Sequence, residues 1–320
     1  MKIGIFTVLY NEMKLEKVLE YVSKLGYECV EIAAWRGSNH IDIEKILSGG
    51  ATEYKKSIEK YGLFISGLSN HLEGQLVLGP HDESTDEWFK GSPEEKIKYG
   101  IERMKRTAEA ASALDVSVVN GFTGAPNWGA WYIFPPAFEK IFEKGFELLA
   151  ERWNGILDVF AAHGIKFAHE VHPQEQAYNI ETSEQALKAL NGRKEFGFNF
   201  DPSHLIWQGI DPVMFIKRFG DRIYHSHAKD AELVKENLPT SGSIPTGAWR
   251  RLGRGFRFRV VGWGDVEWKR VMTALLEVGY DYVLSYEHED PVMSREDGCE
   301  KCIAFLRPLI IKAPLEKVWW

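Results

Sequence analysis

The sequence predicts a single (β/α)8 barrel that spans residues 1–320. Short runs rich in β-branched and aromatic residues alternate with longer amphipathic stretches, and the pair occurs eight times along the chain. This alternation is typical of helices packed around a parallel sheet. No Ser- or Pro-rich linker and no shift in composition divides the chain, which favours one closed barrel over two domains.

The predicted elements follow in order. We expect strands at 3–8, 29–34, 63–68, 116–122, 165–171, 196–200, 223–227 and 282–287. Apolar residues at helical spacing predict helices at 15–25, 94–114 and 138–163. A glycine stands between a helical pattern and the next strand at four junctions, where it supplies a left-handed stop: Gly26, Gly62, Gly164 and Gly279.

Two connections are longer than a barrel requires, namely 70–92 and 229–265. Both follow strands, where the active sites of barrels lie, so we expect binding elements or lids in preference to decoration. The loop after the fourth strand contains Trp128 and Trp131 among four aromatic residues. Such rings suit either the C–H faces of a sugar or a contact between subunits.

Composition excludes some partners. The net charge is -7, from 39 basic and 46 acidic side chains, so no cationic field favours nucleic acid or an anionic membrane. The N-terminal apolar run is too short for a signal peptide, and no stretch is apolar enough to span a membrane. Three cysteines are too few for a disulfide scaffold. We therefore expect a cytoplasmic protein with a small-molecule ligand.

Four of the late strands finish in a cluster of polar residues. These clusters contain Glu170, Asp201, His227 and Glu287. The carboxyl ends of barrel strands converge on one face, and charged groups there are costly to bury unless they are paired or bind a metal. Singly, each residue could be a loop carboxylate, an N-cap or a core histidine. Together, three carboxylates and one imidazole predict one divalent metal, with Mn2+ expected first and Mg2+, Co2+ or Zn2+ as alternatives.

Further residues are candidates for binding the substrate. His204 and His172 follow Asp201 and Glu170 at short spacing and should face the same pocket. His204 could equally orient a ligand carboxylate. The other candidates are His71, Trp128, Trp131, Arg257 and Arg259. The two arginines could clamp a phosphate or carboxylate, or could be solvated or salt-bridged.

These motifs resemble the xylose isomerase-like barrel superfamily, specifically its sugar phosphate isomerase/epimerase group, which includes ketose 3-epimerases and inosose dehydratases. That group carries a metal-binding Glu after strand five, a D-x-x-H motif after strand six, an H-x-K-D motif after strand seven and a Glu after strand eight. The matching residues are Glu170, Asp201 with His204, His227 with Lys229 and Asp230, and Glu287.

The resemblance implies a metal-dependent isomerase or epimerase acting on a keto sugar or sugar derivative. Glu170 and Glu287 would act as acid and base through a metal-stabilised enediolate. A lyase or dehydratase that eliminates a β-substituent from a keto-glycoside or cyclitol stays open as the alternative. An apurinic endonuclease is disfavoured, because no histidine ends strand four and no D-x-H pair soon follows His227. We expect a homo-oligomer, with a second kind of subunit left open.

Overall fold

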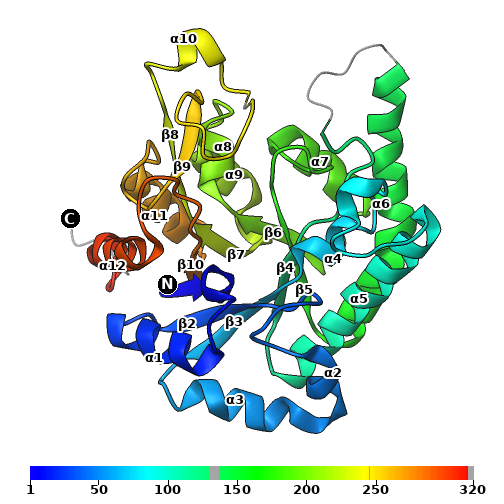
Figure 1. The fold of residues 1–320 in the computed structure, drawn as a ribbon, viewed down its shortest axis with the longest axis horizontal. Coiled ribbons are helices and arrows are strands. Elements are labelled where there is room, and N and C mark those ends of the chain that lie inside the picture. Colours follow the sequence, from blue (N-terminus) through cyan, green and yellow to red (C-terminus); the bar gives the residue numbers. More distant parts are fainter. Residues whose placement is uncertain (130–136, 245, 316–320) are drawn as a thin grey trace.

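The structure, a computed structural model, describes residues 1–129, 137–244 and 246–315. Eight parallel strands close into a barrel in the order β1-β10-β7-β6-β5-β4-β3-β2 (Figure 1). The predicted (β/α)8 fold is confirmed, and each predicted strand overlaps an observed one. The barrel strands are β1 (Lys2–Phe6), β2 (Cys29–Ala33), β3 (Phe64–Ser69), β4 (Val118–Gly121), β5 (Lys166–Glu170), β6 (Phe196–Phe200), β7 (Ile223–Ala228) and β10 (Val283–Tyr286).

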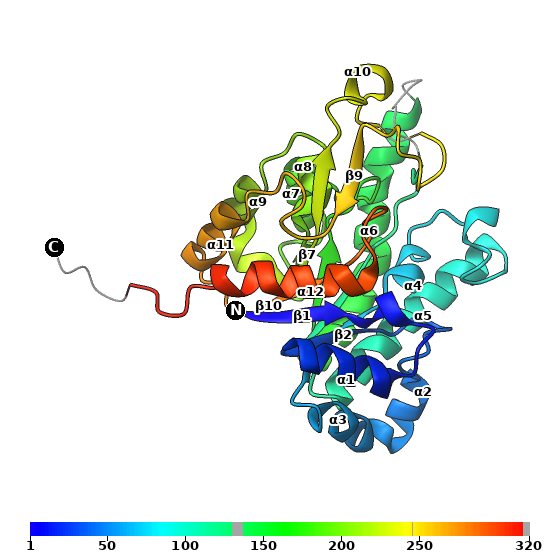
Figure 2. The same ribbon diagram turned by 60° about the vertical axis from the view of Figure 1, so that its left-hand side comes forward.

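Helices surround the barrel (Figures 1 and 2). They are α1 (Leu15–Leu25), α2 (Ile43–Lys45), α3 (Ala51–Glu59), α4 (His71–Gln75), α5 (Pro93–Ala113), α6 (Ala137–Ala162), α7 (Ile180–Ala189), α8 (Pro202–Ile206), α9 (Pro212–Phe219), α10 (Leu238–Ser241), α11 (Trp268–Glu277) and α12 (Arg295–Leu306). The predicted helix 15–25 coincides with α1, whereas α5 and α6 are each shifted by one residue from prediction. Within the described ranges, no helix has both the length and the apolarity needed to cross a bilayer.

The four predicted glycine stops all adopt a positive φ. The angles are 91° at Gly26, 73° at Gly62, 69° at Gly164 and 80° at Gly279. A side chain would be strained in this left-handed region, so glycine lets the chain leave each helix and enter the next strand directly.

Strand alternation decides which side chains face the barrel interior. Phe167 on β5 packs outward against Trp153 of α6, with ring centroids 4.3 Å apart, and Phe198 on β6 packs outward against Phe215 of α9 at 5.4 Å. Because successive side chains point to opposite faces, Glu170 faces inward. The same alternation brings the polar ends of the late strands to one interior surface.

The connection after β7 contains an element that was not predicted from the sequence. It forms an antiparallel pair of strands, β8 (Asp230–Leu233) and β9 (Phe256–Arg259), which stands beyond the barrel together with α10 (Figure 2). The Asp230 carboxylate accepts hydrogen bonds from Gly262 N at 2.9 Å, Val266 N at 3.0 Å and Trp268 Nε1 at 2.8 Å. These bonds tie the two ends of the insertion together at its base.

Candidate metal centre and active site

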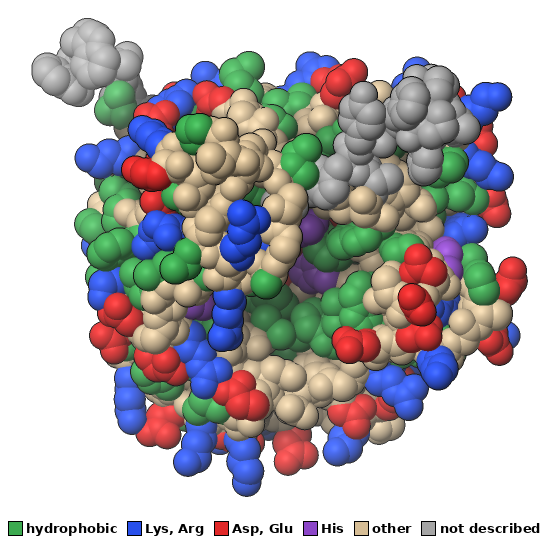
Figure 3. Space-filling model, turned by 45° about the horizontal axis from the view of Figure 1, so that its top comes forward, with side chains coloured by type: hydrophobic (Ala, Val, Ile, Leu, Met, Phe, Trp, Pro, Cys, Tyr) green, Lys and Arg blue, Asp and Glu red, His purple; other side chains and the backbone are tan. Residues whose placement is uncertain are grey.

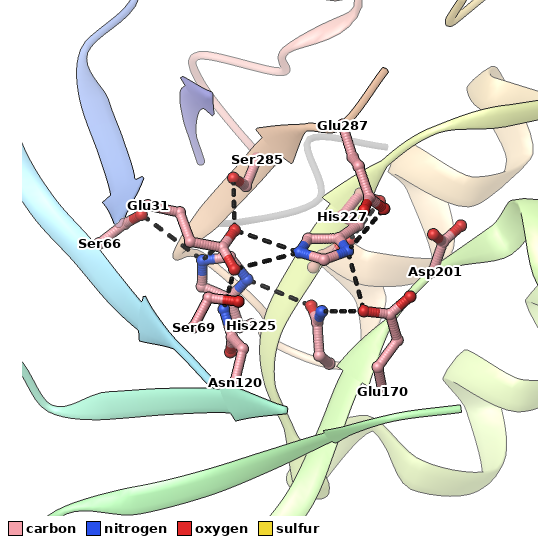
Figure 4. Close-up of polar contacts among 12 residues, drawn as sticks. Glu31, Ser66, Ser69, Asn120, Glu170, Asp201, His225, His227, Ser285 and Glu287 are labelled. Carbon is pink, nitrogen blue, oxygen red and sulfur yellow. Dashed lines mark hydrogen bonds and ion pairs between the residues drawn. The ribbon is translucent and has the colours of Figure 1, made fainter. Parts of the chain in front are cut away.

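The four predicted metal ligands meet at one point of the barrel interior. Glu170 ends β5, Asp201 follows β6, His227 lies on β7 and Glu287 follows β10. Each offers one ligand atom, and the four atoms all lie within 4.8 Å of one another. Figure 4 shows Glu170 and Glu287 reaching the His227 ring from two sides. The sequence prediction thus corresponds to one compact cluster.

The donor atoms of Asp201 and His227 suit a metal. Asp201 Oδ1 accepts a hydrogen bond from Ser203 N at 2.8 Å and so caps α8. Asp201 Oδ2 and His227 Nδ1 are buried and make no hydrogen bond of good geometry among the described residues. Their nearest charged neighbours are Lys229 Nζ, 3.2 Å from the Asp201 oxygen, and the carboxylates of Glu170 and Glu287, 3.3 and 3.2 Å from His227 Nδ1. Asp201 is therefore both an N-cap and a candidate ligand. A cation bound between these atoms would supply the partner that their hydrogen-bonding leaves open.

Glu31 holds the other side of the His227 ring. His227 Nε2 lies 3.2 and 3.1 Å from the two Glu31 oxygens, which also accept from Asn120 Nδ2 and Ser285 Oγ at 2.8 Å each (Figure 4). A proton on Nε2 that faces this carboxylate leaves Nδ1 to act as a ligand. Glu31 was not predicted as a site residue, although a charged residue within the apolar run Cys-Val-Glu-Ile-Ala was a signal.

Two histidines hold the Glu170 carboxylate. His71 Nε2 lies 2.8 Å from Glu170 Oε2, and His204 Nε2 lies 3.0 Å from Oε1. His71 reaches the site from α4, directly after β3, and is nearly fully buried. The structure therefore places two of the three histidines predicted to bind the substrate, His71 and His204, against the carboxylate of a candidate metal ligand.

Lys229 supplies a positive charge to the same cluster. It is fully buried, and its Nζ lies 2.7 Å from Glu287 Oε2 and 2.9 Å from Glu289 Oε2. A further contact of 3.3 Å joins it to His204 Nε2. In the sequence, Lys229 was part of a motif and had no predicted role of its own. Its position beside three carboxylates became visible only in the folded chain.

Electrostatics favours a cation here. Burial alone would raise the pKa of Glu170, but His227, His204 and His71 outweigh it and hold that pKa well below its usual range. Burial together with Glu170 and Glu287 raises the pKa of Asp201 despite Lys229. Burial would lower the pKa of His227, but Glu31, Glu170 and Glu287 raise it well above its usual value. Metal binding at His227 would therefore release a proton.

Aromatic side chains border the cluster. His172 makes an edge-on contact with His204 at 4.4 Å, and the ring of Trp128 stacks parallel to His172 at 5.8 Å. Trp131 falls outside the described residues. Figure 3 shows a hollow on this face of the molecule, with histidine and hydrophobic side chains visible inside it.

Arg257 and Arg259 are engaged in ion pairs. Arg257 Nε donates to Glu232 Oε2 at 2.7 Å, and Arg259 Nε donates to Asp290 Oδ2 at 2.9 Å. Arg259 also contacts Glu232 through Nη1. Of the two roles left open for these residues, the geometry favours the salt-bridged one. Their assignment as substrate ligands stays a prediction.

The chain belongs to the xylose isomerase-like TIM barrel family, whose model matches residues 19–309. Its fold is also that of a solved structure described as IolI protein with a bound zinc atom. That structure superimposes with a TM-score of 0.68 at 18% identity and covers 97% of this chain and 98% of that chain.

Relatives similar in sequence carry several names. The uncharacterized protein YfiH of Bacillus subtilis (strain 168) is 26% identical over 97% of this chain and 99% of its own length. Fructoselysine 3-epimerase of Shigella flexneri is 23% identical over 77% of this chain and 82% of its own. Inosose dehydratase of Clostridium botulinum (strain Alaska E43 / Type E3) is 27% identical over 47% of this chain and 49% of its own length. Epimerase and dehydratase names thus both occur among the relatives.

Proposed function

We propose that this protein is a divalent-metal-dependent isomerase or epimerase of a keto sugar or sugar derivative. The observation that carries the proposal is the convergence of Glu170, Asp201, His227 and Glu287, whose ligand atoms lie within 4.8 Å of one another. Fructoselysine 3-epimerase, similar over most of its length, supports this class of reaction.

Three carboxylates and one imidazole would hold one divalent ion. Mn2+ suits this oxygen-rich set, with Mg2+, Co2+ or Zn2+ as alternatives. The zinc named for the IolI structure supports metal binding in this fold. When bound, the ion would polarise a substrate carbonyl and stabilise the negative charge that forms as the neighbouring C–H proton leaves.

Two glutamates are placed to move that proton. Glu170 and Glu287 come from β5 and β10, with β6 and β7 between them in the barrel, so they can reach a ligand from different sides. One would accept the C–H proton and the other would return it, which inverts the carbon or moves the carbonyl. His71 and His204 fix the orientation of Glu170, and Lys229 fixes that of Glu287. His172 and Trp128 would contact the sugar.

A lyase or dehydratase is the second candidate, and the inosose dehydratase relatives favour it. It shares the first proton abstraction with the epimerase and differs in the second step. If the carbon next to the deprotonated position carries a leaving group, the electron pair expels that group instead of recapturing a proton. The stable product therefore distinguishes the two reactions.

The first experiment combines metal analysis with proton exchange in D2O. We would compare the wild type with Glu170→Gln and His227→Ala, and use Glu184→Gln, an exposed glutamate on α7, as the matched control. The substrates are keto sugars and 3-keto-glycosides. We expect about one metal per wild-type and control chain and deuterium uptake beside the carbonyl, with both lost in the two site variants.

Product analysis assigns the reaction. An epimer or isomer labelled with deuterium supports the first candidate, and an unsaturated product supports the second. A wild-type protein that takes up no metal on reconstitution and exchanges no proton would overturn the proposal.

A further inference from the structure

Arg254, in the segment between α10 and β9, is a buried cation without an acidic partner. It is 6% exposed, and no described carboxylate lies within ion-pair distance of it. The guanidinium carbon lies 4.6 Å from the ring centroid of Trp249 and 5.4 Å from that of Phe256. Its neighbours Arg257 and Arg259 are paired with Glu232 and Asp290. A guanidinium without an acidic partner is free to take an anionic ligand as its counter-ion.

Arg254 lines a narrow pocket beside β9. Its walls include Arg251, Arg257, Trp249, Phe258 and Glu289. The nitrogens of Arg254 are not among the buried polar atoms that lack a partner, so they reach this space or solvent. The enclosed volume is about 10 Å3. That is room for about one water-sized group, so one oxygen of an end group could enter the pocket while the rest of the group stays at its mouth.

The charge of the pocket is positive. Three guanidinium groups line it, and Glu289 is the only carboxylate among its lining residues. The Glu289 carboxylate is already bonded to Lys229 Nζ at 2.9 Å, and Arg251 donates only to Thr246 among the described residues. A positive pocket in a protein with a net charge of -7 is a local feature of this insertion and not a general property of the surface.

The pocket adjoins the metal centre. Phe258 forms part of its wall and also contacts the centre, since Lys229 Nζ lies 4.8 Å from the Phe258 ring and the His204 ring lies 5.2 Å from it. Glu289 bridges the two regions through Lys229, which in turn bonds Glu287. The pocket and the candidate metal centre therefore lie on two sides of the same residues, Phe258 and Glu289.

We propose that Arg254, with Arg251, forms a subsite for an anionic end group of the substrate, either a carboxylate or a phosphate. This inference rests on the proposed function, because it places a charged group on the same sugar derivative. Both anions match the planar fork of a guanidinium, which donates two parallel hydrogen bonds. The insertion after β7 would then select anionic sugar derivatives over neutral ones.

The test compares anionic and neutral probes. We would measure proton exchange with fructose, fructuronate and fructose 6-phosphate for the wild type, Arg254→Gln, Arg254→Lys and the control Arg250→Gln, which changes an exposed arginine outside the pocket. We expect Arg254→Gln to lower kcat/KM for an anionic probe by about 10- to 100-fold without changing that for fructose. Arg254→Lys keeps the charge and should lose less. The preferred anionic probe identifies the end group.

A binding measurement separates this inference from the proposed function. Inorganic phosphate and acetate are titrated into the wild type, Arg254→Gln, Arg250→Gln and Glu170→Gln, and binding is followed by calorimetry. Binding that is lost only in Arg254→Gln supports the subsite, even if no keto sugar exchanges a proton. Binding that survives in Arg254→Gln, or that disappears in Glu170→Gln, overturns it. Thermal unfolding of each variant checks that the fold is retained.

Discussion

Glu31 acts on the candidate metal centre through His227. It is fully buried on β2, and His227, His225 and hydrogen bonds outweigh the effect of burial and lower its pKa to about 2. The carboxylate is therefore charged at every pH at which the protein is studied, and it faces His227 Nε2. Glu31 is a positioning residue that orients the imidazole and increases its basicity.

We predict that Glu31→Gln weakens divalent metal binding by about 10- to 100-fold while the fold is retained. The neutral amide of glutamine fills the same space. It no longer stabilises the form of His227 that carries its proton on Nε2 and leaves Nδ1 to bind the metal. Metal affinity is measured by competition with a chelator. The matched control is Ser285→Ala, which removes one hydrogen bond from an uncharged donor to Glu31 and keeps the charge of Glu31. Equal affinities for Glu31→Gln and the wild type would contradict this role.

At the scale of elements, the loops that follow β4 and β5 are joined by Glu175. Its Oε2 accepts from Gly124 N at 2.9 Å and from Thr123 N at 3.1 Å. The same loops place Trp128 against His172. Burial raises the pKa of Glu175 from an ordinary value of 4.5 to about 8, in spite of these hydrogen bonds.

This shift predicts a pH dependence of stability. Between about pH 4.5 and 8 the folded chain retains the Glu175 proton and the unfolded chain has lost it. The contribution of Glu175 to the free energy of unfolding is therefore complete below about pH 4.5. It declines, by up to about 1.4 kcal/mol per pH unit, as the pH rises toward 8. We expect Glu175→Gln to remove this decline, as measured by denaturant unfolding from pH 5 to 9. Parallel pH profiles for the two proteins would refute the assignment.

The insertion after β7 is the second element that bears on function. Phe258 of β9 contacts Lys229, and Phe258 and Arg254 both line the pocket beside β9. A long, arginine-bearing connection was evident in the sequence, but this hairpin was not. Four-residue strands separated by more than twenty residues have no short turn to reveal their pairing. The sequence therefore did not show that Arg257 and Arg259 pair with Glu232 and Asp290, or that Arg254 has no such partner among the described residues.

In the molecule as a whole, the candidate metal centre joins distant parts of the chain. Its four candidate ligands lie on neighbouring strands of the second half, from Glu170 to Glu287, and β10 pairs with β1 to close the barrel. An unfolded chain does not hold these residues together, so a metal binds the folded state preferentially.

We therefore predict that Mn2+ raises the unfolding temperature. At a concentration 100 times its Kd, the ion should add about 2.7 kcal/mol to the free energy of unfolding. Calorimetry of the metal-free protein with increasing Mn2+ measures the shift, and Asp201→Asn should reduce it strongly. An unchanged unfolding temperature at millimolar Mn2+ would argue against a structural link between this site and the fold. The predicted homo-oligomer and cytoplasmic location stay predictions.

The amino-acid sequence predicts the barrel and the four candidate ligands at its centre. The alternation of apolar runs, the left-handed glycines and the polar ends of four strands are local signals, and they were sufficient to predict Glu170, Asp201, His227 and Glu287. The folded structure was needed to show which other residues contact these four. Glu31 of β2 approaches His227 from across the barrel, Lys229 lies beside Glu287 at the end of the neighbouring strand, and Arg254 lacks the carboxylate that Arg259 has. Such pairings depend on distances through space, which the order of residues along the chain does not contain.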